Sequence, residues 1–210
     1  MTDKQMPLLW GAILWFAAAL LLAARGVFVT RPNELPLALA LAFLVPILLF
    51  VLGLGLSSRW RALVVSVPPV FLIALNGWRF IGLGFLMAYA EGMLPGGFAW
   101  PAGLGDIAMA ATAPWIVARV AADDGFRLSK TFLAWNLFGI ADFLDAVFLG
   151  TLYLWPGFTA GTNTALMQRL PFALIPSFFV PLVAMAHFTL LAQRRSRWSA
   201  MSNPTHTRTV

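Results

Sequence analysis

The sequence predicts an all-α membrane protein, a bundle of six transmembrane helices with both termini in the cytoplasm. Hydrophobic residues make up 60% of the chain and charged residues only 10%, whereas soluble domains have roughly 45–50% and about 25%. The apolar runs are also long and continuous, unlike the alternating segments of ~10 residues that build membrane barrels. No soluble domain fits between the runs, so residues 1–193 are predicted to form a single membrane domain.

Six apolar runs define the predicted spans. They cover residues 8–24, 36–56, 67–90, 104–122, 131–155 and 171–193, and residues 194–210 are expected to form a disordered cytoplasmic tail. At ~1.5 Å per residue, each run is of the length that crosses a hydrocarbon core of ~30 Å. The first run could be a signal peptide, but it exceeds the usual ~7–15 apolar residues of one, so a retained helix is expected.

The basic residues predict the orientation of these spans. Three of the 14 basic residues lie on one side, Arg79 lies within a span, and ten share the side of the termini: Lys4, Arg59, Arg61, Arg119, Arg127, Lys130, Arg194, Arg195, Arg197 and Arg208. Cytoplasmic loops carry an excess of Lys and Arg, which places both termini in the cytoplasm. The net charge of +6 is therefore explained by topology, and no nucleic-acid partner is expected.

Residues 92–105 interrupt the apolar sequence with five glycines and two prolines. This composition predicts a non-helical loop. The loop is either an outer connection or a segment that folds back into the membrane, where irregular backbone is tolerated only around a protein-lined or watery cavity. Asp106 follows it and is expected to cap the fourth helix at the outer mouth, with Glu91 at the interface before it.

Polar residues lie inside the predicted spans, where charges are costly and are functional candidates by default. Counting from the helix ends predicts an inner layer of Asn76, Asn136 and His187, and a central layer of Arg79, Asp142 and Asp145. Residues three apart share a helix face, so an Arg–carboxylate pair is expected between the third and fifth spans. One acid would then be left over to bind a proton or a cation.

Structural interpretations stand beside these functional ones. A buried ion pair and buried asparagines can simply hold helices together. His187 could be a packing histidine, and Asp106 a helix cap. The glycines Gly82 and Gly84 are expected to let another helix pack closely against the third span.

Several chemistries are disfavoured by the sequence. The chain has no Cys, which excludes disulfides and thiolate sites, and it has no HExxH, GxSxG or phosphate-loop motif. His187 is the only histidine within an apolar run, so a haem site would need His187 from two chains. No cofactor and no metal are expected.

Three stretches, RFIGLGFLMAYAEGMLPGGFAWPAGLGD, WNLFGIADFLDAVFLG and IPSFFVPLVAMAH, carry a resemblance to a known family. The chain resembles uncharacterised bacterial multi-pass inner-membrane proteins with no assigned activity, over about 78–187. The resemblance implies a bacterial inner (plasma) membrane location and no particular reaction.

The leading functional hypothesis is a small-solute or proton-linked transporter or channel, with a polar path between the third, fifth and sixth spans. In it, Arg79 binds an anionic group or holds the acids, Asp142 or Asp145 carries the proton, and His187 relays it inward. The alternatives are an intramembrane enzyme acting on a lipid or isoprenoid, and a non-catalytic assembly protein. The expected partners are membrane lipids and a small solute or proton, and a homo-oligomer stays open.

Overall fold

The helices of the computed structural model follow the apolar runs of the sequence. The structure describes residues 5–31, 34–155, 158 and 161–202. These residues are helices and connections without a strand, and six of the helical segments are long and apolar enough to cross a membrane. The predicted all-α fold with six candidate spans is confirmed, and the chain is a multi-pass membrane protein.

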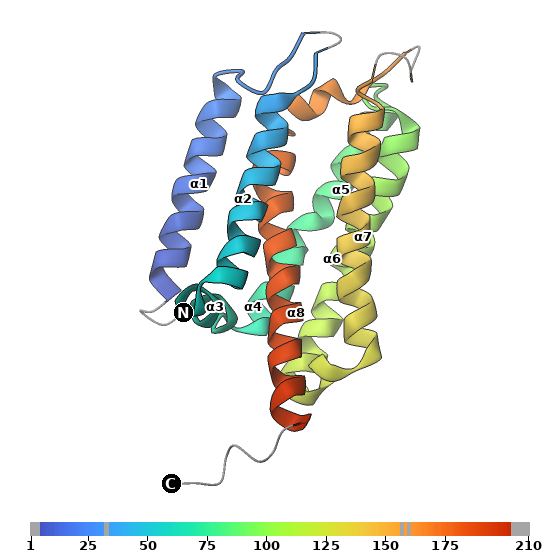
Figure 1. The fold of residues 1–210 in the computed structure, drawn as a ribbon. Helices are drawn as coiled ribbons and strands as arrows, with labels where there is room; N and C mark the ends of the chain where they lie inside the picture. The colour runs from blue at the N-terminus through green and yellow to red at the C-terminus, as the bar shows by residue number, and fades with distance from the viewer. Residues whose placement is uncertain (1–4, 32–33, 156–157, 159–160, 203–210) are drawn as a thin grey trace, which may run out of the picture.

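Eight α-helices and four short helices of other types make up the described chain (Figure 1). The α-helices are α1 (Met6–Ala24), α2 (Leu37–Leu56), α3 (Ser58–Val65), α4 (Pro69–Ala74), α5 (Gly82–Ala90), α6 (Gly96–Ala122), α7 (Lys130–Leu152) and α8 (Val180–Ser202). The short ones are the 3-10 helices η2 (Leu75–Ile81), η3 (Asp124–Leu128) and η4 (Thr164–Gln168), and the π-helix η5 (Ile175–Phe179).

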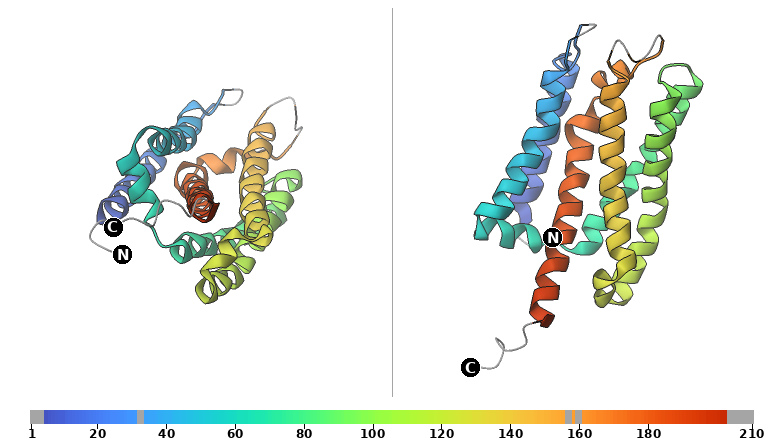
Figure 2. Two further views of the ribbon diagram at one scale, coloured as in Figure 1. Left: turned by 60° about the horizontal axis from the view of Figure 1, so that its bottom comes forward. Right: turned by 45° about the vertical axis from the view of Figure 1, so that its right-hand side comes forward.

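The spans run alternately up and down, so the start of α1 and the end of α8 lie at the same end of the bundle (Figure 1). The helix α8 lies between the α1–α2 pair and the α6–α7 pair (Figure 2). In the most apolar 18 residues of the last span, Ile175–Ser199, 56% are buried, whereas in the corresponding stretches of α1 and α2 only 11% are buried. The core is therefore built around α8, and α1 and α2 present most of their apolar surface outward.

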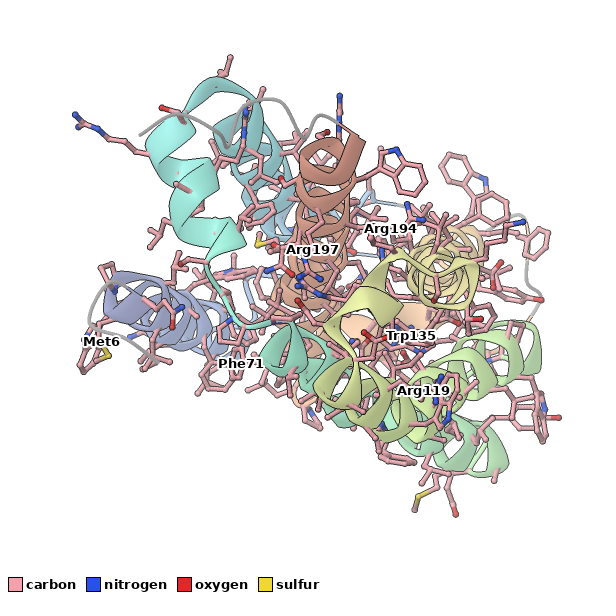
Figure 3. All side chains as sticks on the ribbon, turned by 90° about the horizontal axis from the view of Figure 1, so that it is seen from below. Met6, Phe71, Arg119, Trp135, Arg194 and Arg197 are labelled. Carbon is pink, nitrogen blue, oxygen red and sulfur yellow. The ribbon has the colours of Figure 1, made fainter. Side chains whose placement is uncertain are left out.

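The end that carries the termini is tied together by arginines on α8 (Figure 3). Arg197 pairs with Asp124, which also pairs with Arg127 at 2.5 Å. Arg194 donates to the carbonyl of Leu128 at 3.0 Å. These contacts explain why α8 continues to Ser202, beyond the predicted end at residue 193. The predicted disordered tail is wrong for residues 194–202, and residues 203–210 lie outside the described residues.

The third span is a helix in three pieces, α4, η2 and α5. It begins at Pro69, close to the predicted start, and its middle seven residues form a 3-10 helix. Short 3-10 stretches within a longer helix often mark hinges or strained sequence. Asn76 and Arg79 both lie on this segment and are buried.

The prediction of a non-helical loop over residues 92–105 is wrong. After a turn at 91–94, α6 begins at Gly96 and continues through Pro101, so Asp106 lies well inside the helix and does not cap it. In a bilayer the backbone must satisfy its hydrogen bonds within the segment, so Gly and Pro remain in helices there. The glycines serve close contacts: a Cβ added to Gly103 would lie 2.9 Å from the carbonyl oxygen of Gly82.

Candidate functional site

Arg79 joins two aspartates from two other spans in the middle of the bundle. Its Nε donates to Asp106 Oδ1 at 2.6 Å, and one terminal nitrogen, Nη2, pairs with Asp142 Oδ2. The side chains of Arg79, Asp106 and Asp142 are 2%, 13% and 8% exposed. The predicted ion pair between the third and fifth spans is thus confirmed for Asp142, and Asp106 on α6 is a second partner.

Glycines bring the three helices close enough for this cluster. A Cβ on Gly82 would lie 2.5 Å from the carbonyl oxygen of Gly103, so η2 and α5 pack directly on the backbone of α6. A Cβ on Gly105 would overlap the carboxylate of Asp142. The prediction that Gly82 permits close packing is confirmed, whereas Gly84 makes only ordinary contacts. Small residues at such crossings are the usual means by which membrane helices approach.

Two of the predicted acids lie outside the cluster. Asp145 is exposed and forms no ion pair with any described residue, although it is one turn from Asp142. Of the two acids of the fifth span, Asp142 is the partner of Arg79 and Asp145 is the one left over. Glu91 is exposed at the end of α5, as expected for an interface residue.

The inner layer forms a separate, uncharged cluster. Asn136 Nδ2 donates to the backbone oxygen of His187 at 3.2 Å, and its Oδ1 lies 2.8 Å from His187 Nδ1. Since an amide oxygen only accepts, Nδ1 carries the proton and Nε2 is an acceptor. Both side chains are fully buried. The predicted proximity of Asn136 and His187 is confirmed.

The surroundings of His187 are tightly packed. A Cβ on Gly139 would lie 2.6 Å from His187 Nε2 and 2.7 Å from Met109 Cε. The ring of Trp135 lies 5.7 Å from the imidazole, centroid to centroid. Asn76 is fully buried too, but its amide donates to the carbonyl of Ile73 at 3.1 Å and not to His187. Two acceptors, His187 Nε2 and Asn76 Oδ1, have no hydrogen-bond partner among the described residues.

A cavity of about 280 Å³ adjoins the Arg79 cluster. Its walls come from α2, α7 and α8 with η2, α5, α6, η4 and η5, and Arg79, Asp106 and Asp142 are among its lining residues. The remaining lining is mostly aliphatic and aromatic, as in small-molecule sites, which enclose roughly 300–1,000 Å³. Leu44 on α2 and Thr151 on α7 are lining residues that are exposed, so the mouth lies between these two helices.

Three buried N–H groups on lining residues have no acceptor among the described residues. They are Nη1 of Arg79, Nε1 of Trp78 and Nε2 of Gln168. The amide of Gln168 is fixed in this orientation, because its Oε1 accepts from the backbone N–H of Thr30 at 2.9 Å. Trp78 is held by stacking on Phe179, with ring centroids 4.7 Å apart. Each unpaired buried polar group carries a cost in stability.

Sequence reasoning missed part of this site. Trp78 was not a candidate, because an aromatic residue in a span is ordinary, and Gln168 lay in a predicted loop. Asp106 was a candidate, but its pairing with Arg79 was missed; the signal for it is the small residues Ala102, Gly103 and Gly105 before it, which permit helix contact. Among the described residues, no group of three or more His, Asp or Glu side chains is placed to hold a metal ion.

Comparison with protein families finds one matching model, that of a domain of unknown function, DUF8737, over residues 36–194. Neither the curated proteins nor the solved structures contain a match to the chain. The matched region runs from the start of α2 to the last turns of α8 and includes the Arg79 cluster, the cavity and the inner cluster, but not α1. Because the match covers well over half of the chain, the protein belongs to the DUF8737 family.

Proposed function

We propose that the protein is a proton-linked carrier of a small molecule, with the cavity as its binding site and the Arg79 cluster as its proton site. The observation that carries this proposal is a buried arginine between two carboxyl groups at a mostly apolar cavity within the spans. Ionisable groups at such depth are found where protons or substrates cross the membrane.

The charges of the cluster support the proton site. One guanidinium faces two carboxyl groups, so full ionisation leaves one negative charge in a low-dielectric region. An isolated charge at the bilayer centre costs about 2.5–3.5 kcal/mol on insertion scales. A proton shared by Asp106 and Asp142 removes that cost, and an exchangeable proton is what a coupled carrier needs.

The cavity has one described mouth, and its inner side is closed. The end of α7 and η4, which supply the lining residues Thr151, Thr164 and Gln168, lie at the end of the bundle opposite the termini (Figure 1). On the other side, Met109, Gly139 and His187 pack without space for an added methyl group. Transport would therefore require rearrangement, and we place it at η2 and η5, where the regular α-helical pattern is interrupted within a span.

The orientation follows from the basic residues. With the termini in the cytoplasm, the mouth faces the outer half of a bacterial inner membrane. The carrier would then take its substrate from the outer leaflet side and move a proton with it.

Proton movement in liposomes tests the proposal. Purified protein is reconstituted around a pH-sensitive dye, and a low-molecular-mass extract of the expressing cells is added outside, under an imposed membrane potential. We expect a change of internal pH with the wild type and with Asp145→Asn, and none with Asp142→Asn. Asp145→Asn is the matched control for Asp142→Asn, because the two aspartates lie one turn apart on α7. A wild type that moves no protons, or an Asp142→Asn variant that moves them normally, would refute the carrier.

The lateral mouth also favours a second candidate, an intramembrane enzyme acting on a lipid or isoprenoid. A substrate dissolved in the bilayer could enter between α2 and α7, where Leu44 is exposed. This candidate predicts a new product when the protein is incubated with a membrane lipid extract and analysed by mass spectrometry. An unchanged lipid profile together with proton movement would decide for the carrier.

A further inference from the structure

One carboxylate oxygen of the Arg79 cluster has no partner and keeps accessible surface. Arg79 donates to Oδ1 of Asp106 at 2.6 Å, whereas Oδ2 accepts no hydrogen bond from a described residue. Oδ2 is not among the unpaired side-chain atoms that are fully enclosed, and the side chain of Asp106 is 13% exposed. This oxygen can therefore be reached by another molecule.

The accessible surface of Asp106 belongs to the cavity. Asp106 is a lining residue. Its neighbours one turn away on the same face of α6 are Ala102, Met109 and Ala110, and they are 1%, 0% and 1% exposed. This face of α6 is thus closed toward the bilayer, and the cavity is the space that a side chain on it can meet.

The charge of the cluster decides what the ligand must carry. When both acids are ionised, Asp106 and Asp142 exceed Arg79 by one negative charge, and the other lining residues are uncharged. A buried charge is costly unless it is paired. An anionic ligand would add a second negative charge, and a neutral one would leave the first unbalanced. A cation cancels it.

The walls of the cavity suit an organic cation. Five of the lining residues are aromatic, namely Phe43, Trp78, Phe85, Phe98 and Phe143. Aromatic rings attract cations through their negative faces, and most of all where water is excluded. The remaining lining is mainly aliphatic, and a volume of about 280 Å³ suits a ring system or a short chain and not a whole two-chain lipid.

We propose that the cavity binds a small apolar organic cation, such as a protonated alkyl or aryl amine, whose charged end pairs with Oδ2 of Asp106. The inference deepens the proposed carrier by naming its substrate class, and it rests on that function only for the transport of the ligand. Arg79 holds the two acids in place and does not bind the charged end of the ligand.

The cation and the proton of the cluster exclude each other, because each neutralises the same negative charge. A cation that binds the protonated cluster releases the proton to solvent, and the site is neutral before and after. The other charged groups of the site are Arg79 on η2 and Asp142 on α7. The lining residues from α2 and α8 have no titratable group, and His187 on α8 is enclosed with Asn136. A cationic substrate is therefore exchanged for the proton, whereas a neutral one would move together with it.

Three ten-carbon probes test the ligand class: decylammonium, 1-decanol and decanoate. They share an alkyl chain and differ in whether the end is a cation, a neutral hydroxyl group or an anion. Binding of each to the full chain in detergent is measured by native mass spectrometry and by the shift of the unfolding midpoint. We expect one equivalent of decylammonium, bound at least about tenfold more tightly than the other two, since only the cation balances the buried charge.

The pH dependence of binding tests the competition with the proton. An alkylammonium group, like that of Lys, stays charged below about pH 10. Between about pH 9 and pH 5, decylammonium should bind more weakly as the pH falls, by up to about tenfold per pH unit, because the cluster must lose its proton. Binding of 1-decanol should not follow this trend. In weakly buffered solution, decylammonium should release up to one proton per molecule bound.

Matched variants locate the binding. Asp106→Asn leaves an oxygen for Arg79 but removes the surplus charge, so decylammonium should bind at least about tenfold more weakly and without the pH dependence, whereas Asp145→Asn should bind it normally. Ala146→Phe fills the cavity and should abolish binding, whereas Ala141→Phe, on the exposed face of the same helix, should not. If Asp106→Asn does not fold, Ala146→Phe and the pH series still decide.

Two kinds of result would overturn the proposal. One is binding of 1-decanol or decanoate at least as tight as that of decylammonium. The other is decylammonium binding that neither pH, Asp106→Asn nor Ala146→Phe reduces. Because these measurements need no flux, selective decylammonium binding without proton movement in liposomes would leave the ligand class standing and remove only the carrier. Proton movement with the cell extract but no decylammonium binding would do the reverse.

Discussion

The two polar clusters of this bundle are alike in being buried and unlike in chemistry. The Arg79 cluster is ionic, joins three spans and lies on the wall of a cavity of about 280 Å³. The cluster of Asn136 and His187 is uncharged, joins α7 to α8 and is packed without space. The first has the features of a binding site, and the second those of a structural contact.

Each cluster depends on a glycine of the facing helix. Gly105 on α6 gives room to the carboxylate of Asp142, and Gly139 on α7 gives room to the imidazole of His187. The same device leaves Asp142 beside a cavity and seals His187 among Met109 and Trp135. Substitutions in the Arg79 cluster should therefore change both proton movement and stability, whereas substitutions in the cluster of Asn136 and His187 should change stability alone.

The largest effect is expected from Arg79→Met. It leaves Asp106 and Asp142 buried without a counter-ion, and breaking a buried ion pair in this way costs about 3–5 kcal/mol. The unfolding midpoint in detergent should fall sharply. Substituting Asp106→Asn and Asp142→Asn together with Arg79→Met should restore most of the stability but not the proton movement. If Arg79→Met alone were as stable as the wild type, the cluster would not be buried and paired.

Gly105→Ala and Gly139→Ala come next. Each adds a methyl group where a side chain of the facing cluster lies, and overpacking costs about 1–3 kcal/mol. Gly105→Ala should also reduce proton movement, because it displaces Asp142, whereas Gly139→Ala should affect stability alone. Gly11→Ala is the control, since a Cβ there meets nothing within 4 Å. Equal loss of proton movement in both variants would contradict the division of roles.

Asn136→Ala should have a smaller effect. It removes two hydrogen bonds to His187 and leaves the buried imidazole without its partner, at about 1–2 kcal/mol. The midpoint of unfolding should fall while proton movement in liposomes stays near that of the wild type. Loss of movement at retained stability would instead support the predicted relay role of His187.

The smallest effect is expected from Asp145→Asn. The residue is exposed on α7 and pairs with no described residue, and such substitutions stay within about 0.5 kcal/mol. The unfolding midpoint and the proton movement should both match the wild type. A marked loss in either would return Asp145 to the site.

The sequence predicted the fold better than the site. Six long apolar runs settled the class, the number of spans and most helix ends, because length and composition alone decide membrane insertion. The pairing of Arg79 with an aspartate of the fifth span also followed, since few buried charges were present to pair. The choice between Asp142 and Asp145 depended on how α7 is rotated, which a three-residue spacing does not fix.

Residues 96–105 show why the remainder was missed. Gly and Pro in this number predict a loop by the rules of water-soluble chains. In the membrane they form the first turns of α6, and the same glycines bring Asp106 to Arg79 and admit Asp142. The site therefore depended on a tertiary crossing that only the arrangement of the helices reveals.

The protonation of the Arg79 cluster is the most direct test of the central claim, that two carboxyl groups share one arginine and one proton inside the membrane. Infrared difference spectra of the protein in lipid nanodiscs, taken between two pH values, report the C=O stretch of a protonated carboxyl group. We predict a band in the wild type and in Asp145→Asn. The band should be lost in Asp106→Asn and in Asp142→Asn, because each of these variants leaves one acid for the arginine. A spectrum without such a band, or a band unaffected by either cluster variant, would contradict it.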